Sequence, residues 1–259
     1  MIRGTREWAV AEINCCIGCP HGCLYCYGRT AAMNRGLVRS AGEWSKSRII
    51  VDDVEKEHPR YPGQVMFPAA HDITMENIDA AIAVVDNLLV SGNRVLIVSK
   101  PSPEIITRLC ERFSGKREQI LFRFTITARS EEILSFWEPG APTFRQRLQA
   151  LSLAHSRGFA TSVSVEPMLE IGDVAALVTE LEPLVTHSIW IGKMNRIGAR
   201  VAVDSVRVAE EVDRIEREQG DAEIRKLYGS LQHHPLIRWK ESIKEVVGLP
   251  LSDQAGLDR

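Results

Sequence analysis

The 259-residue sequence lacks any hydrophobic run long enough to cross a membrane. Its longest apolar stretch, residues 78–90, is interrupted by Asp79, Asp86 and Asn87, whereas a transmembrane helix needs about 20 mostly apolar residues in succession. The first residues, MIRGTREWAVAEIN, also lack the apolar core of a signal peptide. We therefore expect a cytoplasmic protein that has no membrane partner.

The sequence has almost no excess of either charge. Its 32 Lys and Arg residues against 34 Asp and Glu residues give a formal net charge of −2, which argues against a dedicated nucleic-acid-binding protein because such proteins carry a basic surface. The basic stretch from Arg29 to Arg48 keeps nucleic acid open as a substrate, but the charge balance favours a solvated loop with scattered cations. There is no internal repeat or low-complexity segment, and a chain of this length suits one large α/β domain.

Cysteine is scarce outside one short segment. Five of the six cysteines lie within residues 14–29, NCCIGCPHGCLYCYGR, and three of them, Cys19, Cys23 and Cys26, have the spacing C-x3-C-x2-C. A reducing cytoplasm argues against disulfides, and a zinc ribbon would separate its two cysteine pairs by roughly 15–20 residues. Thiolates are the usual ligands of iron–sulfur clusters. Three thiolates on one loop can hold three irons of a cubane cluster and leave the fourth iron open.

The other three cysteines fall outside that spacing. Cys15 and Cys16 precede the triplet, and we interpret them as small buried residues or spare thiols. The sequence leaves open whether they help to bind a second metal. Cys110 shares one helical stripe with Ile106 and Leu109, which predicts that it belongs to the hydrophobic core.

Apolar strands alternate with amphipathic helices along most of the chain, a pattern that predicts a parallel sheet with right-handed crossovers. We expect six strands, at residues 8–14, 65–69, 94–100, 120–127, 160–166 and 188–193. We expect helices at residues 30–34, from Thr74, after Pro103, after Gly140, after Asp173 and after Asp204. Residues 35–62 are expected to be irregular. Residues 221–248 are expected to form two more helices, the second carrying Leu236, Trp239, Ile243 and Val246 on one face.

The cysteine triplet, with Tyr25 just before its third member, resembles the radical S-adenosylmethionine (SAM) superfamily. The segments CPHGCLYCYGR, WEPGAPTFRQRLQAL and SVSVEPML are together similar to its spore photoproduct lyase-like branch, and the resemblance covers roughly residues 8–195. It implies an α/β fold, an open (β/α)6 partial TIM barrel with a helical C-terminal extension. The expected organisation is a radical SAM core at 1–200, with its cluster loop at 15–27, and C-terminal helices at 201–259 packed on the same domain.

The same resemblance implies the chemistry. Cys19, Cys23 and Cys26 would hold a [4Fe-4S] cluster whose open iron binds the amino and carboxylate groups of SAM. Reductive cleavage of SAM would give methionine and a 5′-deoxyadenosyl radical, which abstracts hydrogen from an unassigned substrate. A reductant such as flavodoxin or ferredoxin would supply the electron.

Two alternative functions stay open. The first is repair of a nucleic-acid lesion, but the lyase itself uses a cysteine in its barrel as hydrogen donor. Here Cys110 is the only cysteine outside the N-terminal loop, and it is predicted to be a core residue, so this function is not favoured. The second is an iron–sulfur electron carrier or a metal-stabilised binding module without SAM chemistry. Such modules are usually small, whereas this chain devotes most of its length to a barrel.

Polar residues at the ends of the expected strands are the candidates for contacts with SAM, because barrels place their chemistry at the C-terminal face of the sheet. The superfamily that the chain resembles has a small-residue stretch here that receives the SAM amino group, and Ala69, Ala70 and Asp72 match that place loosely, since the usual double glycine is absent. Asp72 could instead cap the next helix, and His71 could pack at the surface. Lys100 could pair with the SAM carboxylate or with a substrate phosphate.

The remaining strands add further candidates. Thr125 and Thr127 could bind ribose oxygens, and Gly192 could let adenine approach the backbone. Glu166 could bind a ligand or form a structural ion pair with Arg123 or Arg129. Asn195 could face SAM or the substrate. The complete set of predicted SAM-binding residues is Tyr25, Ala69, Asp72, Ser99, Lys100, Thr125, Thr127, Ser164, Glu166, Gly192 and Lys193.

Overall fold

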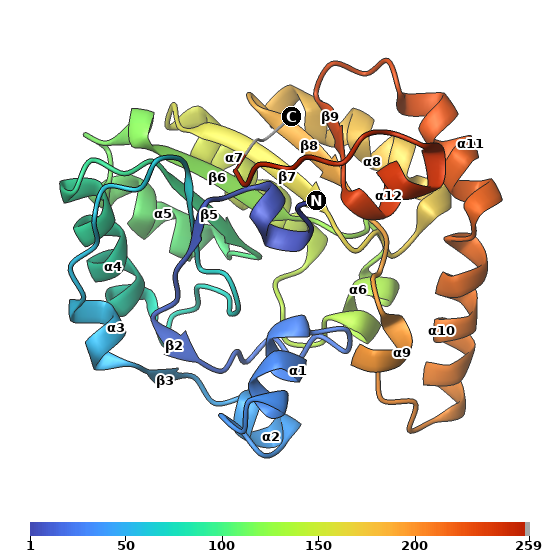
Figure 1. Ribbon diagram of the computed structural model, residues 1–259, viewed down its shortest axis with the longest axis horizontal. Coiled ribbons are helices and arrows are strands. Elements are labelled where there is room, and N and C mark those ends of the chain that lie inside the picture. Colours follow the sequence, from blue (N-terminus) through green and yellow to red (C-terminus); the bar gives the residue numbers. More distant parts are fainter. Residues whose placement is uncertain (257–259) are drawn as a thin grey trace.

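A curled sheet of seven parallel strands organises the chain (Figure 1). We describe it from a computed structural model, in which residues 1–256 are described. The strand order, β1-β4-β5-β6-β7-β8-β9, follows the chain, as expected for successive right-handed crossovers. The strands are β1 (Ala11–Glu12), β4 (Val65–Phe67), β5 (Val95–Ser99), β6 (Ile120–Thr125), β7 (Ala160–Val165), β8 (Ser188–Ile191) and β9 (Ile237–Trp239). The predicted α/β open partial barrel with C-terminal helices is confirmed.

Four crossover helices cover the outer face of the sheet. They are α4 (Ile78–Val90), α5 (Pro103–Arg112), α7 (Phe144–Ser156) and α8 (Val174–Leu181). Their starts follow local rules: the Ser102 side chain caps α5, and Thr143 and Gln146 form a capping box at α7. Cys110 lies on α5 with only 2% of its surface exposed, which confirms that it belongs to the core.

The N-terminal region differs from the expectation. The strand predicted at residues 8–14 is reduced to β1, because the chain leaves the sheet to begin the cysteine loop. The loop itself begins with β2 (Cys16–Ile17), and it is followed by α1 (Tyr27–Asn34), α2 (Ala41–Trp44), β3 (Arg48–Ile49) and α3 (Val51–Glu55). Residues 35–62 are therefore not simply irregular, since β3 pairs with β2 as a short antiparallel ribbon. A 3-10 helix, η1 (Gly4–Glu7), precedes β1.

The C-terminal part corrects a second expectation. It contains α9 (Ile197–Arg200), α10 (Val206–Glu218), α11 (Asp221–Leu231) and α12 (Glu241–Val247). The helix predicted to carry both Leu236 and Trp239 is wrong in its first half, because Ile237–Trp239 forms β9 and pairs with β8. A short apolar run cannot be assigned to helix or strand from its periodicity alone. The proposed division at residue 200 stays a prediction.

Three smaller differences remain. Helix α4 begins at Ile78 rather than near Thr74, whose backbone N–H donates to the Asn77 side chain at 2.9 Å. An additional helix, α6 (Glu131–Trp137), follows β6, and its N-cap is Ser130. Short 3-10 helices occur at η2 (Arg117–Gln119), η3 (Ile171–Asp173) and η4 (Glu182–Leu184). Among residues 1–256, no helix has both the length and the apolar character to cross a membrane.

Candidate functional site

The carboxyl ends of the strands open into a cavity of about 530 Å³. This volume lies within the range of about 300–1,000 Å³ that small-molecule sites occupy. Cys19, Cys23 and Cys26 contribute to its wall. Nine of the predicted SAM-binding residues also line it: Tyr25, Ala69, Asp72, Ser99, Lys100, Thr125, Ser164, Glu166 and Lys193. His71, Ala70 and Asn195 do so as well, whereas Thr127 and Gly192 lie outside the lining.

The three cysteines are free thiols on one loop. Cys19 and Cys23 are buried, and Cys26 is half-buried at the start of α1, where its sulfur accepts the Arg29 backbone N–H at 3.3 Å. Burial raises the pKa of Cys23 to about 12, although the nearby Lys100 ammonium acts in the opposite direction. The Cys23 thiol is therefore protonated at neutral pH until a metal displaces its proton. The donor set suits a thiolate-bound cluster.

Two glycines allow the cysteine loop to pack as it does. At Gly18, which has φ of 108°, a Cβ atom would lie 2.4 Å from the Lys46 carbonyl oxygen. At Gly28, a Cβ atom would lie 2.2 Å from the Ala70 carbonyl oxygen. Both separations are far below van der Waals contact. The cysteine loop can therefore approach residues 44–46, and α1 can approach the segment after β4, only because side chains are absent at these positions.

Asp72 organises the end of β4. One carboxylate oxygen accepts the Ser99 hydroxyl at 2.8 Å and the Lys100 backbone N–H at 2.6 Å. The other lies 3.0 Å from His21 Nδ1 and 3.8 Å from Lys100 Nζ. Burial alone would raise the pKa of Asp72, but Lys100 and His21 outweigh it and hold the pKa well below its usual range. Asp72 thus fixes the position of Lys100, which lies 5.9 Å from the centre of the Tyr25 ring.

Glu138 and Arg147 form a buried ion pair behind the cysteine loop that sequence reasoning missed. Their side chains have no exposed surface, and Arg147 Nη2 lies 2.5 Å from Glu138 Oε2. The other Glu138 oxygen accepts hydrogen bonds from the hydroxyls of Tyr25 and Thr127. Thr127 therefore supports the wall of the cavity through Glu138. The loop after α6 also contacts the cysteine loop directly, because the Gly140 N–H donates a hydrogen bond to the His21 carbonyl at 2.8 Å.

A second buried charge cluster, also missed, surrounds Lys240 at the end of β9. Lys240 Nζ lies 2.5 Å from Glu7, 3.4 Å from Glu241 and 3.8 Å from Glu166. Burial, together with a hydrogen bond to Glu241, raises the pKa of Glu7 to about 8. A Cβ atom on Gly192 would lie 2.8 Å from the Lys240 side chain. Gly192 therefore gives room to this cluster.

Glu166 has a different partner from the two that the sequence suggested. It faces Lys240, whereas Arg129 pairs with Asp173 and Glu180. Arg123 instead lies 4.6 Å from the centre of the Trp8 ring. Lys240, which follows β9, is therefore an ion-pair partner of Glu166 that sequence patterns did not reveal, and Arg123 adds an electrostatic attraction that acts to lower the pKa of Glu166.

Comparison with solved structures finds proteins of similar fold. Spore photoproduct lyase complexed with dinucleoside spore photoproduct aligns with a TM-score of 0.54 and 16% identity, covering 92% of this chain and 80% of that chain. The chain has the fold of spore photoproduct lyase. The chain is also similar in fold to Streptococcus suis SuiB bound to S-adenosylmethionine, with a TM-score of 0.56 and 6% identity. That alignment covers 95% of this chain and 54% of SuiB.

Sequence comparison adds one relative. Uncharacterized protein ORF301 of Acidianus two-tailed virus is 26% identical over 184 residues, which span 67% of this chain and 60% of the viral protein. No family model matches the chain. The similarity in fold to these solved structures confirms the resemblance that the cysteine segment suggested.

Proposed function

We propose that the chain is a radical SAM enzyme. Cys19, Cys23 and Cys26 would hold a [4Fe-4S] cluster, and SAM would bind beside it in the 530 Å³ cavity. When bound, the cluster supplies the electron that cleaves SAM reductively to methionine and a 5′-deoxyadenosyl radical, which abstracts hydrogen from the substrate. A small reductant such as flavodoxin or ferredoxin would deliver that electron.

One observation carries this proposal: the C-x3-C-x2-C cysteines and nine of the eleven predicted SAM-binding residues line the same cavity. An electron carrier needs a cluster but has no need of a cavity next to it. The fold similarity to SuiB bound to S-adenosylmethionine points to the same ligand.

The chain's own residues would orient SAM. Lys100 offers the cavity a cation for the SAM carboxylate, held in place by Asp72. The backbone N–H groups of Ala69 and Ala70 are already bonded to the Asn14 side chain, at 2.9 and 2.7 Å. We therefore propose that this stretch receives the SAM amino group through its carbonyl oxygens, which are hydrogen-bond acceptors.

The substrate is left unassigned. Each cysteine that lines the cavity in the described residues belongs to the cluster triplet, while Cys110 lies in the core. This arrangement offers no cysteine as hydrogen donor to a substrate radical, so we do not favour lesion repair by the lyase route. Thr5, Glu241 and Ser242 line the part of the cavity formed by the chain termini, and we propose that they contact the substrate.

The test is formation of 5′-deoxyadenosine. The protein is reconstituted anaerobically with iron and sulfide, reduced with dithionite and mixed with SAM, and the products are separated by chromatography. We expect 5′-deoxyadenosine from the wild type and from the control Cys110→Ala, and none from Cys23→Ala. SAM cleavage that persists in Cys23→Ala would overturn the proposal.

A further inference from the structure

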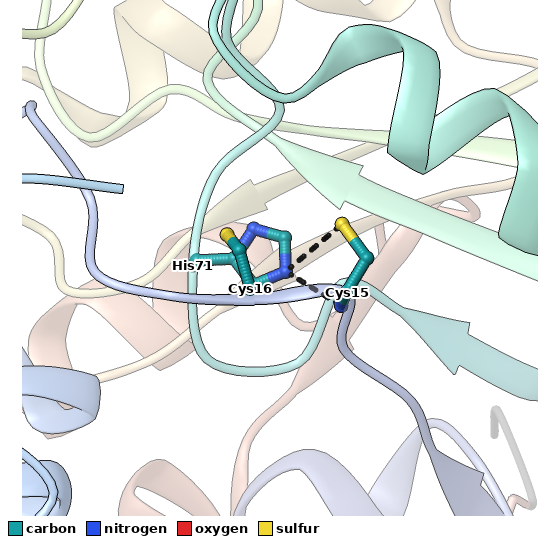
Figure 2. Close-up of side chains that lie close together, drawn as sticks. All are labelled: Cys15, Cys16 and His71. Carbon is teal, nitrogen blue, oxygen red and sulfur yellow. Dashed lines mark hydrogen bonds between the residues drawn. The ribbon is translucent and has the colours of Figure 1, made fainter. Parts of the chain in front are cut away.

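Cys15, Cys16 and His71 form a buried cluster apart from the three cysteines of the proposed iron–sulfur site. Their two sulfur atoms and one ring nitrogen all lie within 4.8 Å of one another. Figure 2 shows the three side chains close together, with dashed lines from the His71 ring to the sulfur and the backbone nitrogen of Cys15. The exposed fractions are 0% for Cys15, 5% for Cys16 and 7% for His71. No step of the proposed SAM chemistry uses these side chains.

This convergence is unusual for adjacent residues. Successive side chains of an extended segment point to opposite sides, so neighbouring cysteines ordinarily cannot share a partner. Here His71, from the loop after β4, reaches both. Its Nδ1 lies 3.0 Å from the Asp72 carbonyl oxygen. Because a carbonyl only accepts, Nδ1 carries the hydrogen, and Nε2 presents its lone pair toward Cys15.

The distances suit a metal ion. His71 Nε2 lies 3.7 Å from Cys15 Sγ, close to the separation of about 3.6 Å that tetrahedral geometry gives with Zn–S of about 2.3 Å and Zn–N of about 2.0–2.1 Å. The same Nε2 accepts the Cys15 backbone N–H at 3.2 Å, a contact that a bound ion would replace. The Asn77 amide lies 3.6 Å from Cys16 Sγ and donates to it, as outer partners of metal thiolates do.

We propose that Cys15, Cys16 and His71 bind one zinc ion. Three protein ligands leave a fourth position for water, which can arrive from the cavity that His71 lines. The ion would join the segment that enters the cluster loop to the loop that carries Asp72. Since Asp72 in turn contacts His21 of the cluster loop, zinc would hold together the two loops that form the cavity. This site does not depend on the proposed SAM chemistry.

The test is metal analysis of the anaerobically purified protein, produced in medium supplied with iron and zinc. We expect one zinc ion per chain in addition to iron. Zinc K-edge absorption, which iron does not obscure, should show two sulfur neighbours at about 2.3 Å and nitrogen or oxygen neighbours at about 2.0–2.1 Å. Absence of zinc from the wild type would overturn the proposal. So would three or four sulfur neighbours around the zinc, because they would place it among the cysteines of the triplet.

Three variants assign the ligands. Cys16→Ser and His71→Gln should lose the zinc, with Cys16→Ser keeping its iron. Cys23→Ala should lose iron but keep zinc, and the buried control Cys110→Ala should keep both. Zinc that remains in both Cys16→Ser and His71→Gln would show that these residues are not its ligands.

Discussion

Replacing Glu138 by glutamine tests whether the buried ion pair supports the cluster loop. The amide can still accept hydrogen bonds from Tyr25 and Thr127, so the change removes charge and little else. Arg147 would be left without a counter-charge in a site where neither side chain is exposed. Removing one partner of a buried pair typically costs about 3–5 kcal/mol, and we expect the free energy of unfolding to fall by about that amount.

The assay is urea unfolding at neutral pH, in which the transition midpoint shifts while the slope stays constant if only stability changes. The matched control is Asp79→Asn, which breaks the Arg108–Asp79 pair at the surface, where the aspartate side chain is 86% exposed. We expect the control to lose less than about 1 kcal/mol. A loss in Glu138→Gln no larger than that of the control would refute the reasoning.

The stability of the protein in acid is a second test of the same ion pair. Burial would raise the pKa of Glu138, but Arg147 and Lys100 outweigh it and lower the pKa below 4.5. A carboxyl whose pKa is lowered on folding stabilises the protein above its unfolded pKa and loses that contribution as the pH falls through the folded value. The wild type should therefore lose more stability in acid than Glu138→Gln.

Three further predictions concern the cavity and its supports. In Gly28→Ala the new Cβ would lie 2.2 Å from a carbonyl oxygen, so this change should lower the free energy of unfolding by about 1–3 kcal/mol. The control Gly42→Ala, at a helical position with open space around it, should not lower it. Equal losses of stability in the two variants would contradict the packing argument. Because the pKa of Glu7 is raised from 4.5 to about 8, the free energy of unfolding should fall as pH rises across that interval. Urea titrations at several pH values should show a smaller decrease for Glu7→Gln than for the wild type. The same pH profile in both proteins would argue against this role of Glu7. Lys100→Met should weaken SAM binding by roughly tenfold or more, measured by calorimetry on the cluster-loaded protein, and an unchanged affinity would remove Lys100 from the site.

Much of the fold was predictable because the signals are local. The strands around Val65, Val95 and Ile120 are short apolar runs between turn residues, as expected of strands buried on both faces of a parallel sheet. By contrast, β9 is only Ile237–Trp239, and its pairing with β8 depends on contacts distant in sequence. The spacing of Leu236 relative to later apolar residues imitates a helix, so periodicity gave the wrong answer there.

The candidate site divides in the same way. The cysteine triplet is recognisable because its members are four and three residues apart in the sequence. Glu138 and Lys240 carry no such signal, because their partners Tyr25 and Glu7 lie 113 and 233 residues away in the sequence. Buried charges are costly without partners, but only the folded chain shows which partners they have.

The most direct test of the central claim is the electron paramagnetic resonance spectrum of the reduced, reconstituted protein with and without SAM. We expect SAM to change the cluster signal, because its amino and carboxylate groups would bind the iron that the three cysteines leave open. A cluster whose spectrum is the same with saturating SAM would contradict the account and favour an electron carrier.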